Sequence, residues 1–462
     1  MASYDVVVIG AGPGGYVAAI RVAQLGLHTA VVEADRAGGV CGNWGCIPSK
    51  AILHDAALAA DLRAAAKQQL IAEAPAVDFG RVIDRSRGVA DRQAKGVEAL
   101  FKKNKIDFHH GRGRLVPHGV MVAKAAGGEE RLEARNVILA TGSAERVLPG
   151  LTIDGDVICT SREALERRTL PASVVVIGGG AVGVEFAYAY RSFGAAVTVV
   201  EMAEQILPGM DADLGKELAR QFGRQGIEVL VGHRVESVVR SGDGAQVTVR
   251  GGDAGRTLEA HMVLVAVGRG ADPSGLGLDA AGIRSVRGRV EVDGTMRTSA
   301  PGVYAIGDLV GPLLLAHAAS EQGVIAAEAI AGAHPRPFDP DGVPMCVYCE
   351  PEVAAVGLSE AEAKRRGLEV KIGTFPFRAL GKAMAVGHLE GFVKVVLDAR
   401  YEAVLGVHMI GHGVTELIAA AGLARTLEAT ADDVIATSHA HPTLSEALRE
   451  ATLAAVGRAV NI

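Results

Sequence analysis

Two cysteines that lie close together carry the most evident chemistry in this sequence. Cys41 and Cys46 are separated by four residues, two of which are glycines. A disulfide across so short a ring removes little entropy from the unfolded chain, so it would stabilise the fold only modestly. Because a short, strained ring opens and closes more readily than a structural crosslink, the spacing favours redox chemistry. The alternative is two buried cysteines beside a glycine turn.

The residues after the pair predict a helix that positions the second cysteine. Residues 47–62 are rich in Ala and Leu, and Pro48 stands in the expected first turn. We therefore expect Cys46 near a helix N-terminus, where the helix dipole and Lys50 favour its thiolate.

A glycine motif of the dinucleotide-binding type precedes the cysteines. A β-branched run at residues 4–9 predicts a buried strand, and an Ala-rich helix is expected to reach residue 26. The motif glycines between them are Gly10, Gly12 and Gly15. Gly10 permits a tight turn, Gly12 lets the backbone approach a pyrophosphate, and Gly15 lets the helix pack on the strand. A second strand over residues 29–32 ends at Glu33, placed to bind ribose hydroxyls. A glycine turn without a ligand is the alternative.

The same arrangement returns later in the chain. A strand at residues 173–177 precedes the motif, and another at 196–200 ends at Glu201. The glycines of this second motif are Gly178, Gly180 and Gly183. The acid stands 23 positions after the first glycine in both copies, as Glu33 does after Gly10. The repeat predicts two dinucleotide sites in one chain.

Glu201 also predicts which nicotinamide cofactor the second site prefers. A carboxylate at this strand end accepts a hydrogen bond from a ribose 2′-hydroxyl but repels a 2′-phosphate. After Glu201 there is no basic residue until Lys216. We expect NAD to be preferred over NADP.

The remaining N-terminal and central segments complete the two units. Residues 63–105 read mainly as a solvated packing helix, and strands at 137–140 and 263–267 end at Thr141-Gly142 and Gly268. A further strand before Gly307-Asp308 offers a carboxylate for ribityl or ribose hydroxyls, the alternative being a simple turn. A helix is expected over 317–331, beginning at His317, and a proline-rich linker over 334–340.

The C-terminal part has a different pattern, with strands first and helices afterwards. The expected strands are 353–356, 371–377, 392–397 and 404–409, and the expected helices are 415–427, 431–435 and 445–456. This order predicts an α+β domain.

Near the end of the chain, a histidine and a carboxylate could form an oriented base. Glu446 follows His441 by five residues across a turn and could fix its tautomer and raise its basicity. A solvated or core histidine is the alternative, and His439 fits that description. Cys346 and Cys349 lie on an expected strand, where positions three apart point to opposite faces. We expect neither a disulfide nor a metal site there, and no metal site elsewhere.

Composition and charge narrow the class of protein. The 462 residues carry a net charge of −6 without a basic block, which argues against nucleic-acid or anionic-membrane binding. The apolar runs have strand length, far short of a membrane span. Five cysteines in so long a chain do not make a secreted disulfide scaffold. With Met1 almost directly before the first strand, no targeting segment is expected in this chain, and a cytoplasmic location fits best.

Taken together, these motifs resemble the pyridine nucleotide–disulfide oxidoreductases nearly from end to end. The segments that carry the resemblance are 10–21, 39–50, 140–142, 178–185, 307–308 and 439–451. Within the family, the chain is similar to the flavoproteins of 2-oxo acid dehydrogenase and glycine-cleavage complexes. The resemblance implies an α/β fold with two Rossmann-like dinucleotide-binding domains and a C-terminal α+β dimerisation domain. The implied division is 1–148 for FAD, 149–268 for NAD, 269–338 completing the FAD site, and 339–462 for the homodimer interface.

The resemblance also implies roles for individual residues. Cys41 would exchange with the substrate disulfide and Cys46 would face the flavin. His441 would act as the base toward the disulfide of the other subunit, with Glu446 as its partner, and Lys50 and Glu185 would pair near the flavin. The implied FAD residues are Gly10, Gly12, Gly15, Glu33, Lys50, Thr141, Gly142, Asp308 and His317. The implied NAD residues are Gly178, Gly180, Gly183, Glu185, Glu201 and Gly268.

The implied reaction is oxidation of protein-bound dihydrolipoamide to lipoamide with NAD+ as acceptor. The implied partners are lipoyl domains and the acyltransferase core of such a complex. An NAD(P)H-dependent reductase of another disulfide is the alternative, as is a chain that serves mainly as a docking subunit. NADP-selective, mercuric-reductase-like and transhydrogenase-like relatives are disfavoured. This chain lacks the basic residues after the second strand and a C-terminal cysteine pair, and it keeps Cys46. The bulk of Trp44 could alter the substrate channel.

Overall fold

The N-terminal strand lies at the centre of the first sheet. The computed structural model describes residues 2–252 and 254–461. β1 (Ala2–Ile9) pairs in parallel with β2 (Thr29–Glu33) and with the second half of β6 (Glu129–Leu139). Its residues Val6, Val7 and Val8 are fully buried, as expected for β-branched residues in a parallel sheet covered on both faces. The strand expected at 137–140 is thus the end of a much longer one.

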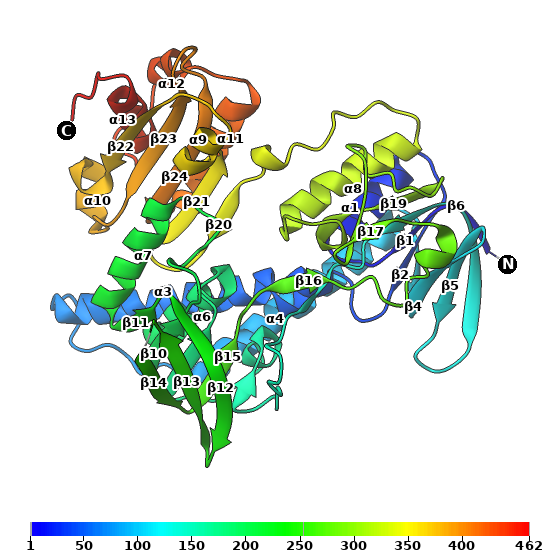
Figure 1. The fold of residues 1–462 in the computed structure, drawn as a ribbon, viewed down its shortest axis with the longest axis horizontal. Coiled ribbons are helices and arrows are strands. Elements are labelled where there is room, and N and C mark those ends of the chain that lie inside the picture. Colours follow the sequence, from blue (N-terminus) through cyan, green and yellow to red (C-terminus); the bar gives the residue numbers. More distant parts are fainter. Residues whose placement is uncertain (1, 253, 462) are drawn as a thin grey trace.

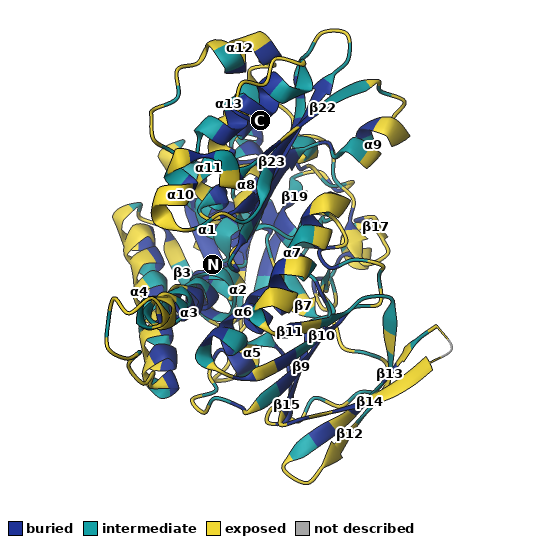
Figure 2. Ribbon diagram, turned by 90° about the vertical axis from the view of Figure 1, so that its left-hand side faces the viewer, coloured by how far each residue is buried: buried dark blue, intermediate teal, exposed yellow. Residues whose placement is uncertain are grey.

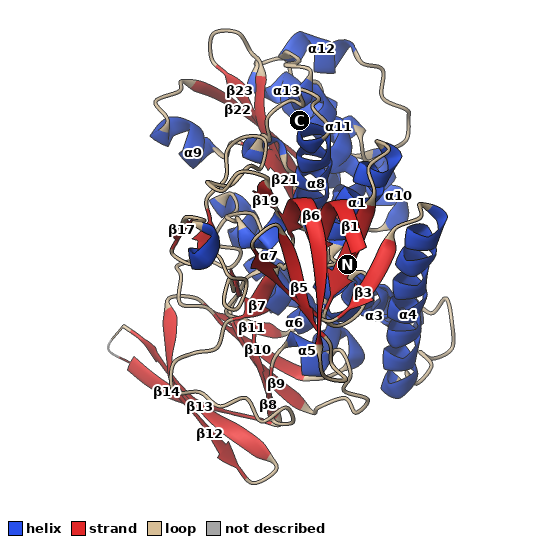
Figure 3. Cartoon of the chain, turned by 90° about the vertical axis from the view of Figure 1, so that its right-hand side faces the viewer, coloured by secondary structure: helices blue, strands red, loops and turns tan. Residues whose placement is uncertain are grey.

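Other strands extend this sheet on both sides (Figure 3). They are β3 (Asp107–His110), β4 (Arg112–Val116), β5 (Gly119–Ala123) and β19 (Val303–Ala305). β19 pairs with β6 in parallel and so returns from far along the chain to the first sheet. Its C-terminal end therefore lies at the same edge as the ends of β1 and β2.

The second sheet repeats the parallel arrangement, with the order β11-β10-β9-β15-β8. Its strands are β8 (Ile158–Cys159), β9 (Ser173–Ile177), β10 (Ala196–Val200), β11 (Ile227–Leu230) and β15 (Met262–Val265). An antiparallel sheet that sequence reasoning did not predict projects from it (Figure 2). It consists of β12 (His233–Ser241), β13 (Gly244–Gly251) and β14 (Ala254–Ala260).

Helices link and cover the two parallel sheets. They are α1 (Pro13–Gln24), α2 (Gly39–Trp44), α3 (Cys46–Lys67), α4 (Phe79–Lys103), α5 (Ser161–Ala164), α6 (Ala181–Phe193), α7 (Ala212–Gln225) and α8 (Ala316–Ile330). The region expected as one helix over 63–105 is interrupted at residues 68–78, and Asp78 caps α4 by accepting a hydrogen bond from the Arg81 amide. α3 packs against α4 and against α6, so the cysteine-bearing helix lies between the two nucleotide-type units (Figure 1).

The C-terminal sheet is antiparallel, with the order β20-β21-β24-β23-β22. Its strands are β20 (Met345–Val347), β21 (Glu352–Gly357), β22 (Val370–Pro376), β23 (Phe392–Asp398) and β24 (Val404–Gly411). The helices that follow are α11 (Val414–Thr426), α12 (Ala431–Ala436) and α13 (Glu446–Ala455). Two short helices that the sequence did not predict, α9 (Glu360–Arg365) and α10 (Gly381–Val386), lie between these strands.

Short pairings and a long connection complete the chain. The pairings are β7 (Ser143–Glu145) with β16 (Arg269–Ala271) and β17 (Ser285–Val286) with β18 (Arg289–Val290). Residues 331–344 run from α8 to β20 and arch above α8 in Figure 1. Among the described residues, no helix combines the length and the apolar character needed to cross a bilayer.

Candidate active site

The two cysteines lie on two consecutive helices. Cys41 is in α2, Gly45 separates the helices, and Cys46 is the first residue of α3. The expected ring is therefore mostly helical, while the prediction that Cys46 stands at a helix N-terminus agrees with the structure. Both residues are free thiols and half-buried, and their side chains are hydrogen-bonded to each other.

This contact and the surrounding charges polarise the pair. The hydrogen bond from Cys41 and the nearby Lys50 ammonium lower the pKa of Cys46 to about 7, against burial, which raises it. The same hydrogen bond, together with burial, raises the pKa of Cys41 well above its ordinary value. Cys46 is thus the thiolate and Cys41 the proton donor, as a reactive dithiol at a helix N-terminus requires.

Lys50 is held beside Cys46 by a buried carboxylate from the second unit. Its Nζ lies 2.9 Å from both carboxylate oxygens of Glu185 in α6, and Glu185 is only 6% exposed. The backbone N–H of Tyr348 donates to Glu185 at 3.0 Å, and Lys50 Nζ lies 4.5 Å from the centroid of the Tyr348 ring. The structure therefore brings together the predicted pair and adds Tyr348, which sequence reasoning missed.

The first glycine loop has the geometry of a phosphate-binding turn. Gly10 has φ +106°, and an added Cβ would lie 2.3 Å from the carbonyl oxygen of Ala140. A Cβ on Gly15 would lie 1.9 Å from the carbonyl oxygen of Gly10. At the end of β2, Glu33 accepts hydrogen bonds from the amides of Ala11 at 2.7 Å and Asp35 at 2.8 Å.

The second glycine loop reproduces this geometry almost atom for atom. A Cβ on Gly178, at φ +111°, would lie 2.3 Å from the carbonyl oxygen of Ala266, and one on Gly183 would lie 1.9 Å from that of Gly178. Glu201 accepts hydrogen bonds from the amides of Gly179 at 2.6 Å and Ala203 at 2.8 Å. Since each carboxylate oxygen has a second lone pair, both acids can still accept from ribose hydroxyls.

Further predicted residues lie where the first and second sheets meet. Asp308 accepts a hydrogen bond from Ser143 Oγ at 2.5 Å, and burial raises the pKa of Asp308. Arg269 donates to the same Ser143 Oγ at 3.0 Å. Gly142 and Gly268, which adjoin these residues, have φ of +73° and +101°. Ser143 and Arg269 are thus additional candidates, and their only sequence signal was their place next to Thr141-Gly142 and Gly268.

The predicted base lies on the C-terminal part of the chain. His441 Nδ1 lies 2.9 Å from Glu446 Oε1, and the other carboxylate oxygen accepts from the Thr443 amide at 2.9 Å. The His441 side chain is 77% exposed, and the His441-Pro442 bond is cis. The other predicted histidine, His317, is the second residue of α8. Its Nε2 lies 2.7 Å from the carbonyl oxygen of Pro344, the residue before β20.

Trp44, the last residue of α2, contacts side chains from both nucleotide-type units. Its ring centroid lies 4.4 Å from the guanidinium carbon of Arg87 and 3.9 Å from that of Arg162. Its indole N–H donates to Asp35 at 2.9 Å. Arg87 belongs to α4 and Arg162 to α5 of the second unit, so the indole is held in place from both sides.

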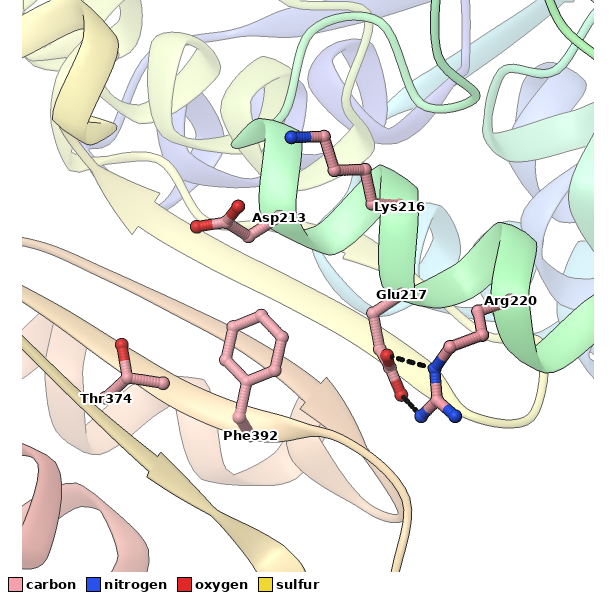
Figure 4. Close-up of a pocket in the computed structure, with 6 residues that line it drawn as sticks. All are labelled: Asp213, Lys216, Glu217, Arg220, Thr374 and Phe392. Carbon is pink, nitrogen blue, oxygen red and sulfur yellow. Dashed lines mark hydrogen bonds and ion pairs between the residues drawn. The ribbon is translucent and has the colours of Figure 1, made fainter.

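A cavity of about 320 Å³ lies away from these residues, between α7 and the edge of the C-terminal sheet (Figure 4). Its lining residues are Asp213, Lys216, Glu217, Arg220, Thr374 and Phe392. Close by, Lys394 is buried with Nζ 2.8 Å from Asp213, 3.0 Å from Glu360 and 3.2 Å from Asp211. This region is an ion-paired seam between the second unit and the C-terminal sheet.

Two equivalent dinucleotide-type loops and a polarised dithiol between them define a class of protein: a nucleotide-dependent oxidoreductase acting on dithiols and disulfides. Comparison with known families agrees. Residues 4–323 match the model of the pyridine nucleotide-disulphide oxidoreductases, and residues 343–452 match that family's dimerisation domain. The chain belongs to the pyridine nucleotide-disulphide oxidoreductase family, which confirms the resemblance and the predicted fold class.

Relatives and solved structures place the likeness more narrowly. The chain is 46% identical over 461 residues to a dihydrolipoyl dehydrogenase of Zymomonas mobilis and 44% identical over 469 residues to one of Bacillus subtilis, covering 99% of each chain in both cases. Its fold is similar to a crystal structure of LpdA from Mycobacterium tuberculosis, with TM-score 0.90, 30% identity and coverage of 98% and 99%. It is also similar to the HOCl-induced flavoprotein disulfide reductase RclA from Escherichia coli, with TM-score 0.85, 27% identity and coverage of 97% and 99%.

Proposed function

We propose that this chain is a dihydrolipoamide dehydrogenase: it oxidises protein-bound dihydrolipoamide to lipoamide with NAD+ as acceptor. The observation that carries the proposal is the dithiol of Cys41 and Cys46, held between two glycine loops and beside the Lys50–Glu185 pair. The full-length likeness to dihydrolipoyl dehydrogenases supports the substrate. Reduction of another disulfide is the second candidate, favoured by the likeness to RclA.

The first loop fits FAD and the second fits NAD. An added Cβ on Gly12 would meet nothing nearer than the Cα of Gly39, at 4.0 Å, and one on Gly180 would meet nothing within 4 Å. Backbone amides at each helix N-terminus thus face space that a pyrophosphate can occupy. FAD held there would supply two-electron redox chemistry between the dithiol and NAD+. Glu33 and Asp308 would hold the hydroxyls of the first cofactor, and Glu201 those of the second.

The chain's own residues account for the sulfur chemistry. His441 takes a proton from one dihydrolipoyl thiol, and the resulting thiolate attacks Cys41 Sγ of the oxidised Cys41–Cys46 disulfide. The Cys46–Cys41 bond breaks, and Cys46 leaves as a thiolate beside Lys50. The second substrate thiol attacks the mixed disulfide and gives its proton to the leaving Cys41 sulfur, which releases lipoamide and leaves Cys41 as a thiol hydrogen-bonded to Cys46 while His441 keeps the first proton.

The proposal includes a homodimer in which His441 and Glu446 serve the cysteine pair of the other subunit. The match of residues 343–452 to a dimerisation domain and the exposure of His441 in the single chain support it. The division at residues 148, 268 and 338 is likewise proposed, supported by the separate sheets. Lipoyl domains and the acyltransferase core of a 2-oxo acid dehydrogenase or glycine-cleavage complex are the proposed partners.

Replacement of Cys46 tests the function directly. Cys46→Ser should abolish lipoamide reduction while leaving NADH-to-dye activity, since hydride transfer from NADH does not need the dithiol. Stopped-flow mixing of the wild type with dihydrolipoamide, then with NADH, should give a long-wavelength absorption band that the variant lacks. The matched control is Cys159→Ser, because Cys159 is a buried cysteine of β8 in the second sheet. Lipoamide turnover that survives in Cys46→Ser would overturn the assignment.

A further inference from the structure

Three metal-ligating side chains meet outside the cysteine site, on three turns at one end of the C-terminal sheet. Glu350 lies between β20 and β21, His388 between α10 and β23, and His412 between β24 and α11. One ligand atom from each lies within 4.8 Å of the others. No local motif marks these three residues, because they are far apart along the chain.

The arrangement aims both imidazoles at the same carboxylate. His412 Nδ1 lies 3.3 Å from Glu350 Oε2, and His388 Nδ1 lies 3.7 Å from Glu350 Oε1. The two rings are stacked, with centroids 4.0 Å apart and planes 10° apart. Both imidazole Nδ1 atoms thus face one carboxylate, so a single cation can be shared by the three side chains.

The surroundings favour a cation and hold the ligands in place. The carboxylates of Glu352 and Asp61 add negative charge around His412. Glu352 is itself fixed by the Thr415 amide at 3.0 Å and by Thr415 Oγ1 at 2.8 Å. The backbone of Glu350 is fixed from the second unit, because Gln225 Nε2 donates to its carbonyl oxygen at 2.8 Å.

We propose that Glu350, His388 and His412 form a binding site for a divalent transition-metal ion of the Zn2+ type. Two imidazoles and one carboxylate suit such an ion, whereas Ca2+ and Mg2+ require oxygen ligands. Tetrahedral Zn2+ at about 2.0–2.1 Å from its ligands holds ligand atoms roughly 3.3 Å apart and lies in the plane of each imidazole, so loading requires the stacked rings to turn out of parallel. The His388 and His412 side chains are 28% and 45% exposed, which leaves an approach for the ion and a fourth position for water.

A metal ion here ties three turns into one unit. The β20–β21 turn begins at Tyr348, whose amide holds Glu185 beside Lys50. The site therefore stabilises the C-terminal sheet next to the elements that support the cysteine pair, without contacting the cysteines. It is independent of the proposed substrate, and it differs from the expectation that the chain holds no metal.

Equilibrium dialysis against Zn2+ tests the site. The oxidised, metal-stripped holoenzyme is used at pH 8, since a Cys41–Cys46 disulfide removes the competing dithiol and few protons compete with zinc for its ligands at that pH. Bound zinc, measured by plasma mass spectrometry, should reach one ion per chain. His388→Ala and His412→Ala should each lower the affinity by at least about tenfold, since loss of even an outer partner of a ligand costs that much.

Two further variants separate the site from general effects. Glu350→Gln keeps the size of the side chain but removes its charge, and it should weaken zinc binding similarly. His334→Ala, an exposed histidine of the linker, should bind zinc as the wild type does. Zinc should also raise the Tm of the wild type and of His334→Ala but not of His388→Ala. Failure of the oxidised wild type to retain zinc, or equal retention in all four variants, would overturn the proposal.

Discussion

The two glycine loops share one backbone geometry but differ in what lies over them. A Cβ on Gly39, at the start of α2, would lie only 2.6 Å from the Cα of Gly12, so the cysteine-bearing segment closes over the first loop. Around Gly180, the corresponding residue of the second loop, a Cβ would meet nothing within 4 Å. The chain therefore closes over Gly12 of the first loop, whereas no residue closes over Gly180 of the second.

The difference teaches how one fold, used twice, can serve two purposes. The connection after β2 contains α2, α3 and α4, whereas the connection after β10 contains only α7. The longer connection covers the first loop and places the dithiol beside it. A covered loop suits a cofactor that stays bound through many turnovers, and an open loop suits a cofactor that enters and leaves. This matches the proposed assignment of FAD to the first loop and NAD to the second.

The contact between Gly39 and Gly12 gives the largest expected effect. Gly39→Ala places a methyl group 2.6 Å from backbone at a residue with φ +57°, which should destabilise the segment by about 1–3 kcal/mol and release most of the bound flavin. The ratio of flavin to protein absorbance after gel filtration measures the loss. Gly42→Ala, whose Cβ would meet only the Gln93 side chain at 3.4 Å, is the control. Full flavin content in Gly39→Ala would show that the covering segment does not retain the cofactor.

The acid at the end of β10 gives the next effect. We expect kcat/KM for NADH to exceed that for NADPH by roughly 100-fold, since placing a phosphate against the Glu201 carboxylate costs several kcal/mol. Glu201→Gln removes the charge and should narrow the ratio, while flavin content stays unchanged because Glu33 serves the first loop. Steady-state kinetics with both nucleotides measure it. Equal use of NADPH by the wild type would contradict the assignment of the second loop.

The open space around Gly180 predicts a substitution that changes NADH binding without changing stability. Because nothing in the protein approaches its Cβ position, Gly180→Ala should leave the Tm unchanged. The methyl group should nevertheless obstruct the pyrophosphate and raise the KM for NADH about tenfold, equivalent to about 1.4 kcal/mol. Differential scanning fluorimetry and NADH titration measure the two quantities. An unchanged KM would mean that the phosphates bind elsewhere.

Local patterns predicted much of the fold and of the candidate site. Strand, glycine motif and acid occur in a fixed order, so both loops and the acids at their strand ends could be predicted from spacing alone. The helix start at Cys46 and the pairing of His441 with Glu446 are also local. Each depends on residues within a few turns of one another or on a motif with a known geometry.

Contacts between distant segments could not be predicted in this way. Tyr348 reaches Glu185 across 163 positions, and nothing in its own neighbourhood marks it. The helical form of α2 depends on packing, because a segment with glycines at both ends has a low intrinsic tendency to form a helix. In the antiparallel β12–β14 sheet, β12 and β14 are mostly exposed and give little apolar signal. β13 does alternate buried Ala245, Val247 and Val249 with polar residues, a strand pattern that sequence reasoning overlooked.

The smallest expected effect is a pH dependence that comes from the Cys46 thiolate, in the segment that follows the first loop. With the pKa of Cys46 lowered to about 7, the thiolate predominates above that pH and is protonated below it. The long-wavelength band of the reduced enzyme should therefore fall to roughly half on lowering the pH from 8.5 to 7. Since the second loop carries no cysteine, the KM for NADH should stay level over the same range. Lys50→Met removes the ammonium that helps lower this pKa, so the midpoint of the band should move to higher pH. A midpoint that Lys50→Met leaves unchanged would show that Cys41, rather than Lys50, accounts for the stability of the thiolate.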